Sequence, residues 1–138
     1  MSYYWLAILT SAIWGIAPIL EKTGLAKVAP LTGLFYRSLG VVLGLILLAF
    51  FMVKPQEIKS ADLRSVAFIM AGGFLASFLA QILFYHSLKI GDVSKVVPIS
   101  GSYPLVAFVL GIIFLGEAVT PVKIAGCLCV IFGIWLLK

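Results

Sequence analysis

Long runs of apolar residues, separated by short polar stretches, set the pattern of this chain. The runs cover residues 3–20, 31–53, 65–88, 96–115 and 121–137. Each is close to the ~20 residues that an α-helix needs to cross the hydrocarbon core of a bilayer. Prolines, glycines and polar residues of the kind that start or end helices stand between the runs. The pattern therefore predicts an all-α integral membrane protein with a bundle of five transmembrane helices.

The connecting segments leave little room for anything besides the membrane part. Only residues 54–64 have a clearly solvated composition, and this segment is too short for a domain. Thr120 precedes Pro121, a pairing that predicts a capped helix start. The first run lacks the basic start and the small-residue cleavage pattern of a secretory signal, so we expect it to remain as a helix. We predict one membrane domain over residues 1–138.

Composition supports a lipid environment and excludes several other classes. Hydrophobic residues make up 63% of the chain and charged residues 11%, whereas roughly a quarter of a soluble domain is charged. The net charge of +5 comes from scattered basic residues, which argues against a nucleic-acid partner. Cys127 and Cys129 point to nearly opposite sides of a helix and cannot form a disulfide. With His86 far away in sequence, we expect no metal site and no cofactor.

The basic residues on the two sides of the predicted bundle bear on its orientation. The side that holds the N-terminus receives Lys54, Lys59, Arg64 and Lys123. The other side receives Lys22, Lys27, Arg37, Lys89, Lys95 and Lys138. The positive-inside rule then places the C-terminus in the cytoplasm, but the excess is small and insertion in both orientations also fits. A chain inserted both ways could supply both halves of an inverted-repeat transporter.

Polar residues recur at helical spacing within three of the predicted spans. The stripes are Ser11, Trp14, Pro18 and Glu21; Ser77, Gln81 and Tyr85; and Ser100, Tyr103 and Ala107. Polar groups in hydrocarbon usually face a bundle interior or a cavity, although the same residues can simply hold helices together. Pro104 is expected to bend the fourth span. Our candidate substrate-contacting residues are Trp14, Gln81, Tyr85, Ser100 and Tyr103.

Two charged residues near the membrane ends have candidate roles of their own. Glu21 and Arg37 are candidates for ion coupling or charge pairing. Arg37 could extend to the interface or pair with a carboxylate, and we favour the interface. Glu117 and Lys123 are expected to shape the turn before the last span. Because the predicted spans contain no pair of carboxylates and the chain has one histidine, we do not expect an enzyme.

Several motifs together carry a family resemblance. They are the run from Leu88 to Ile99, then Tyr103-Pro104 and Phe114-Leu115-Gly116-Glu117, with Trp14-Gly15, Lys22, Arg37 and the ending from Gly126 to Leu137 in agreement. Over essentially its whole length the chain resembles the EamA domain of the drug/metabolite transporter superfamily. Most members of that family are fusions of two such five-helix domains in inverted orientation, with ten helices around a central cavity. The resemblance implies that this chain is half of such a transporter.

The resemblance also implies a function and a partner. We expect a secondary transporter or exporter of a small metabolite, an amino acid or related compound, in the cell (inner) membrane. It would work by alternating access as an antiparallel homodimer, or with a related chain. One alternative is a proton-coupled exporter of cationic compounds like the small multidrug resistance proteins, for which residues 3–20 lack the central carboxylate and only Glu21 stands nearby. The other is a membrane assembly subunit that transports nothing.

Overall fold

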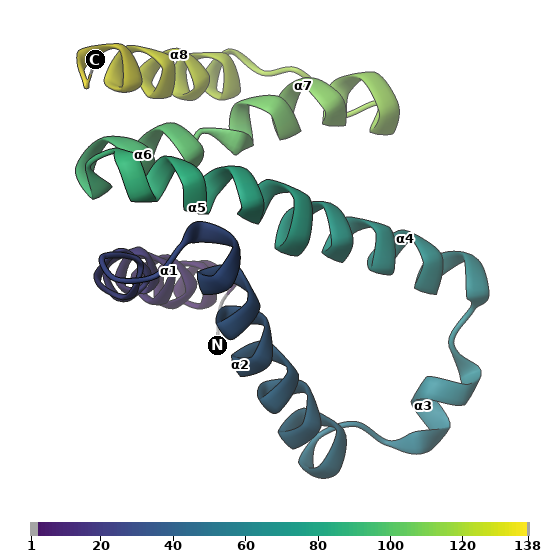
Figure 1. Ribbon diagram of the computed structural model, residues 1–138. Coiled ribbons are helices and arrows are strands. Elements are labelled where there is room, and N and C mark those ends of the chain that lie inside the picture. Colours follow the sequence, from purple (N-terminus) through teal and green to yellow (C-terminus); the bar gives the residue numbers. More distant parts are fainter. Residues whose placement is uncertain (1–2, 138) are drawn as a thin grey trace. The chain divides into compact units, whose positions relative to one another are not determined.

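The computed structural model describes residues 3–137, and the described part of the chain is helical with no strand (Figure 1). The elements, in order, are α1 Tyr3–Leu25, α2 Pro30–Phe51, α3 Pro55–Ser60, α4 Leu63–Phe74, the π-helix η1 Leu75–Leu79, α5 Ala80–Ile90, α6 Val93–Ser100, α7 Tyr103–Leu115 and α8 Pro121–Leu136. The α4, η1 and α5 elements follow one another without a gap. The predicted all-α fold is confirmed.

Four helical segments within residues 3–137 are long and apolar enough to cross a membrane. They are Tyr3–Leu25, Pro30–Phe51, Leu63–Ile90 and Val93–Leu115. The fifth predicted span forms the 16-residue apolar helix α8, which at 1.5 Å per residue extends about 24 Å, somewhat less than a typical hydrocarbon core. The protein is therefore a multi-pass membrane protein, and the count of five crossings stays a prediction.

Several helices extend beyond the apolar runs that predicted them. The first run ends at residue 20, but α1 continues to Leu25 and includes Glu21 and Lys22. The third helical segment likewise covers 63–90 where 65–88 was predicted. Hydrophobicity marks where the hydrocarbon ends, whereas a helix stops only where the backbone is capped or broken, and Glu and Lys are good helix formers. The consequence is that Glu21 lies within a helix.

Local capping explains the starts of several helices. Thr120 accepts a hydrogen bond from the Lys123 backbone N–H at 3.3 Å, which confirms the predicted cap of α8. Asp62 caps α4 by accepting from the Ser65 backbone N–H at 3.0 Å. The short helix α3, which the sequence did not predict, begins with a proline at its first position, where no N–H is needed.

The fourth span is interrupted at Gly101–Ser102, between α6 and α7. Pro104 has no N–H to donate to the carbonyl of Ser100, and its ring crowds that carbonyl. The chain closes the gap with tighter bonds: the Ser102 N–H and hydroxyl both donate to the Ile99 carbonyl, at 3.2 and 2.6 Å. The predicted bend at Pro104 is thus a break in the helix.

The chain divides after Ile90 into two compact units. In the first unit the hydrophobic core consists of Leu25, Leu34, Tyr85 and Leu88. They come from the end of α1, the start of α2 and the end of α5, so the core of this unit lies at one end of its helices. Most other large apolar side chains within residues 3–90 are exposed, as suits helices surrounded by lipid or by further helices.

The second unit holds α6, α7 and α8. Gly116 ends α7 in the left-handed conformation, with φ +66°, which glycine adopts without steric cost. The Glu117 carboxylate lies over Gly111 and pairs with Lys123 Nζ at 3.5 Å. Lys123 also donates to the Ala118 carbonyl at 3.1 Å. Both residues therefore shape the turn before α8, as expected.

Candidate functional site

Two lysines tie the ends of α1 and α5 together. Lys22 in the last turn of α1 donates to the backbone carbonyls of Leu88 and Lys89, which end α5. Lys89 in turn donates to the carbonyls of Leu25, Ala26 and Val28, at and beyond the end of α1. The last carbonyls of a helix lack intrahelical partners and carry the negative end of the helix dipole. Each lysine therefore caps the helix of the other.

Gly33 allows α2 to approach this junction closely. A Cβ at position 33 would lie 2.7 Å from Leu25 Cδ2 and 3.3 Å from Tyr85 Cε1, both shorter than an ordinary carbon–carbon contact. Leu25 and Tyr85 are themselves 1% and 3% exposed, so they have little room to move away. A side chain here would push α2 from α1 and α5, and the absence of one brings three helices together.

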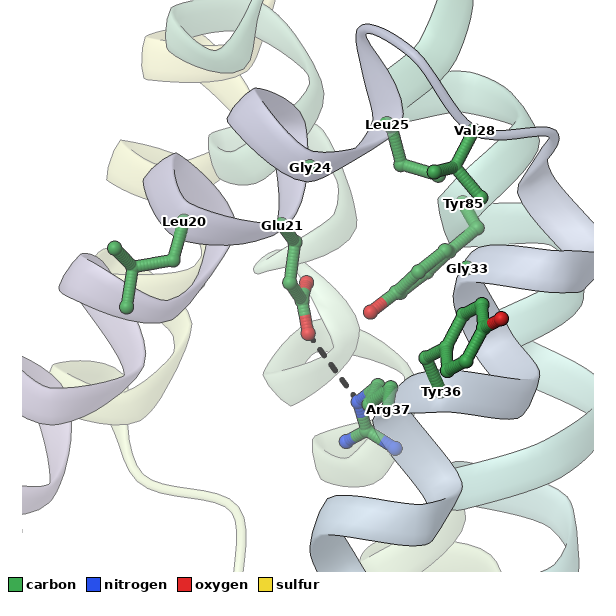
Figure 2. A pocket seen from close by; sticks show the side chains of 9 residues that line it. All are labelled: Leu20, Glu21, Gly24, Leu25, Val28, Gly33, Tyr36, Arg37 and Tyr85. Carbon is green, nitrogen blue, oxygen red and sulfur yellow. Dashed lines mark hydrogen bonds and ion pairs between the residues drawn. The ribbon is translucent and has the colours of Figure 1, made fainter.

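A pocket of about 400 Å³ lies where the three helices meet, within the first unit (Figure 2). Its lining is Leu20, Glu21, Gly24, Leu25, Val28, Gly33, Tyr36, Arg37 and Tyr85. The wall is largely apolar, with three aliphatic side chains, two glycines and two tyrosines beside a single pair of opposite charges. An apolar cavity with a few convergent polar groups is the usual form of a small-molecule site.

The charged residues of the pocket form an ion pair. Arg37 Nε donates to Glu21 Oε1 at 3.2 Å, and the two side chains are 30% and 17% exposed. We expected Arg37 to extend to the interface, and the structure instead directs it to a carboxylate on the neighbouring helix. A half-buried guanidinium in a membrane span is stabilised better by an adjacent anion than by a distant headgroup. The pair links α1 to α2 across the pocket.

Tyr85 supplies the third polar group of the pocket, from α5. Its ring packs against Gly33, and its hydroxyl points toward the Glu21 carboxylate (Figure 2). The side chain is almost fully buried. Glu21, Arg37 and Tyr85 therefore bring one functional group from each of the three helices to a single place.

The predicted site residues fall into three groups. Tyr85, Glu21 and Arg37 line the pocket. Trp14 and Gln81 lie in the same unit but do not line it, and Trp14 is exposed. Ser100 and Tyr103 lie in the second unit, on either side of the helix break. The roles of all seven in binding remain predictions.

The regular stripe predicted in the third span is interrupted by η1. Ser77 lies within the π-helix, where more residues make up a turn than in an α-helix. The side chain of Ser77 is exposed, Gln81 is half-buried and Tyr85 is buried. A spacing of four residues therefore does not keep Ser77 on the face that Tyr85 presents to the pocket.

The sequence did not indicate Tyr36, Gly33 or the reciprocal capping by Lys22 and Lys89. Tyr36 follows no polar stripe, and Gly33 resembles any other glycine in a membrane helix. A lysine in the last turn does signal a capping role. That signal refers to the lysine's own helix, however, and nothing local shows that Lys22 and Lys89 reach across to each other's helix.

Comparisons with known proteins give one consistent result. The model of the EamA-like transporter family matches residues 1–138. An uncharacterised protein of Methanocaldococcus jannaschii is 27% identical over 133 residues, which cover 96% of this chain and 93% of that protein. An uncharacterised transporter in the cobO 3′ region of a Sinorhizobium species is 24% identical over 139 residues, covering 99% of this chain and 96% of that protein. No solved structure matches the chain.

Proposed function

This chain belongs to the EamA-like transporter family, and on that basis we propose that it is a secondary transporter of a small metabolite, an amino acid or related compound. The family is one of transporters and not of enzymes. The observation that carries the proposal is the pocket between α1, α2 and α5, with an ion pair inside it. Charged residues within membrane spans are expensive and usually mark a substrate or ion pathway.

We further propose that two copies in opposite orientations form the working transporter, in the cell (inner) membrane. Secondary transporters often consist of two inverted halves with the substrate between them. The five spans that the sequence predicts are the number expected in one half, and the two relatives described above are of nearly the same length as this chain. The small charge difference between the two sides agrees with insertion both ways. Trp14, Gln81, Ser100 and Tyr103 remain candidate contacts in the assembled cavity.

The pocket favours a metabolite transporter over a proton-coupled exporter of cationic compounds. That exporter needs a membrane carboxylate that is free to exchange protons and cations. Glu21 is the single acidic residue within the candidate spans, and it already has a guanidinium partner at 3.2 Å. An assembly subunit without transport activity would need no such pocket.

Reconstitution into liposomes tests the proposal. Purified protein would be given a panel of radiolabelled metabolites that includes the common amino acids, and uptake down an imposed gradient would be measured. We expect uptake of at least one compound above empty liposomes, and loss of most of it in Tyr85→Ala, with Ile113→Ala, an exposed residue of α7, as the matched control. If none of the panel moves, the transport proposal fails and the assembly role is favoured.

A further inference from the structure

The charge of the pocket is balanced within the protein. Of its lining residues, Glu21 and Arg37 carry charges, and these are opposite. The nearby ammonium groups of Lys22 and Lys89 point instead to the backbone carbonyls that end α5 and α1. The lining of the pocket therefore has one anion and one cation, and no excess of either.

Neutrality constrains which ligand can enter. A singly charged molecule would bring an uncompensated charge into a region of low dielectric, where isolated charge is strongly disfavoured. A ligand with one positive and one negative group adds no net charge. Such a ligand can also separate Glu21 from Arg37 and make a contact of its own with each of them.

The geometry leaves hydrogen-bonding capacity on both partners. Arg37 uses only Nε on Glu21, and its two Nη nitrogens donate no hydrogen bond to the described residues. Figure 2 shows these nitrogens directed away from the Glu21 carboxylate. The edge that the two Nη nitrogens form can bind a carboxylate through two parallel hydrogen bonds. The Glu21 carboxylate, with the Tyr85 hydroxyl beside it, offers acceptors for an ammonium group.

From these observations we propose that the pocket selects compact zwitterions, with Arg37 receiving the ligand's carboxylate, Glu21 its ammonium group and the aliphatic wall its apolar part. This rests on the proposed transport function and makes Glu21 and Arg37 the residues that determine charge specificity. Leu20, Leu25 and Val28 are the aliphatic side chains of the lining, and they suit a branched aliphatic side chain of the ligand.

Three matched probes test charge selection directly. L-leucine is the zwitterion, 4-methylpentanoate is the same molecule without its amino group, and 3-methylbutylamine is the same molecule without its carboxylate. Binding to the purified protein in nanodiscs would be measured by calorimetry. Wild type should bind leucine at least about tenfold more tightly than either fragment, because each fragment lacks one of the two charged groups that form charge-assisted hydrogen bonds with the pocket.

Removing one charge from the pocket should change which of the three probes binds most tightly. Arg37→Gln leaves the carboxylate and should bind 3-methylbutylamine most tightly, whereas Glu21→Gln leaves the guanidinium and should bind 4-methylpentanoate most tightly. Wild-type protein that prefers a fragment to leucine, or binds none of the probes, overturns the proposal, and so does an unchanged order in folded variants. If a single variant does not fold, Glu21→Arg combined with Arg37→Glu restores neutrality and should still prefer leucine; a preference for a fragment would contradict us.

Failure here is separable from failure of the transport function. If metabolites are taken up by the liposomes but leucine does not bind better than its fragments, the protein is a transporter and the charge rule is wrong. If leucine binds with the expected order and no metabolite moves, the binding rule holds and the transport function is wrong.

Discussion

At the scale of single residues, the Glu21–Arg37 contact should contribute measurably to folding. The two side chains are partly exposed, so water screens the attraction and its energy is less than that of a fully buried pair. Removing one partner leaves the other charged and alone in the pocket. Removing both leaves no uncompensated charge.

A double-mutant cycle should detect this coupling. We expect Glu21→Gln and Arg37→Met each to lower the stability in detergent, and the double variant to lose less than the sum of the two. The coupling energy should be about 0.5–3 kcal/mol. Denaturant unfolding of the four proteins measures it. Strictly additive losses would show that the pair makes no energetic contribution.

Gly33 permits the close approach of α2 to its neighbours, and a methyl group there should be harmful. We expect Gly33→Ala to destabilise the protein by about 1–2 kcal/mol, because overpacking outweighs the gain in helix propensity. The matched control is Gly40→Ala in the same helix, where a Cβ meets nothing within 4 Å. It should be neutral or slightly stabilising. Equal thermal shifts in the two variants would contradict the role of Gly33.

At the scale of elements, the reciprocal lysine caps join two helices that are far apart in the sequence. Lys22 and Lys89 reach the ends of α5 and α1 respectively. The ends of these two helices therefore lie on the same side of the membrane, as expected if the first and third spans cross in the same direction. The caps also hold Glu21 and Tyr85, which stand one and four residues before the two lysines, at the pocket.

Loss of one cap should loosen the junction. We expect Lys89→Met to cost about 1–3 kcal/mol of stability, because several carbonyls lose a charged donor. Lys27→Met is the control, since the Lys27 side chain is exposed and makes no hydrogen bond or ion pair in the part of the chain that the structure describes. Unfolding in detergent compares the two variants. A Lys89→Met protein as stable as the control would argue against the cap.

The break in the fourth span should depend on Pro104. In Pro104→Ala the backbone N–H returns, and we expect α6 and α7 to merge into one helix. Spin labels at positions 95 and 115, in a background with Cys127 and Cys129 replaced by serine, would then move apart toward the ~30 Å of a continuous helix of that length. Pro98→Ala, within α6, should leave the distance unchanged. An unaltered distance in Pro104→Ala would mean that Gly101–Ser102 breaks the helix without the proline.

At the scale of the whole molecule, the proposed inverted pair makes a prediction about orientation. A single cysteine at position 59, placed in the background with Cys127 and Cys129 replaced by serine, should react with a membrane-impermeant reagent from both sides of the membrane. Each side should label a substantial share of the population. Labelling confined to one side would exclude two orientations of the same chain.

The sequence predicted the membrane helices well and the site only in part. Apolar runs identify spans because residues that face the lipid hydrocarbon must be apolar. Hydrophobicity does not report the hydrogen bonds that determine helix ends, the π-helix and the reciprocal caps formed by Lys22 and Lys89. The pairing of Arg37 with Glu21 was one of two possibilities, because a sequence does not show which helices are neighbours.

The ion pair also bears on how the chain enters the membrane during synthesis. Glu21 and Arg37 stand near the facing ends of consecutive helices joined by residues 26–29, so both emerge from the ribosome almost together. Inserting a lone charge in mid-membrane costs about 2.5–3.5 kcal/mol on translocon scales, and less near the ends of a span. A paired hairpin of α1 and α2 would avoid much of that cost. We therefore expect the translocon to release these two helices as one unit, and the later helices to assemble on a hairpin whose pocket charges are already matched.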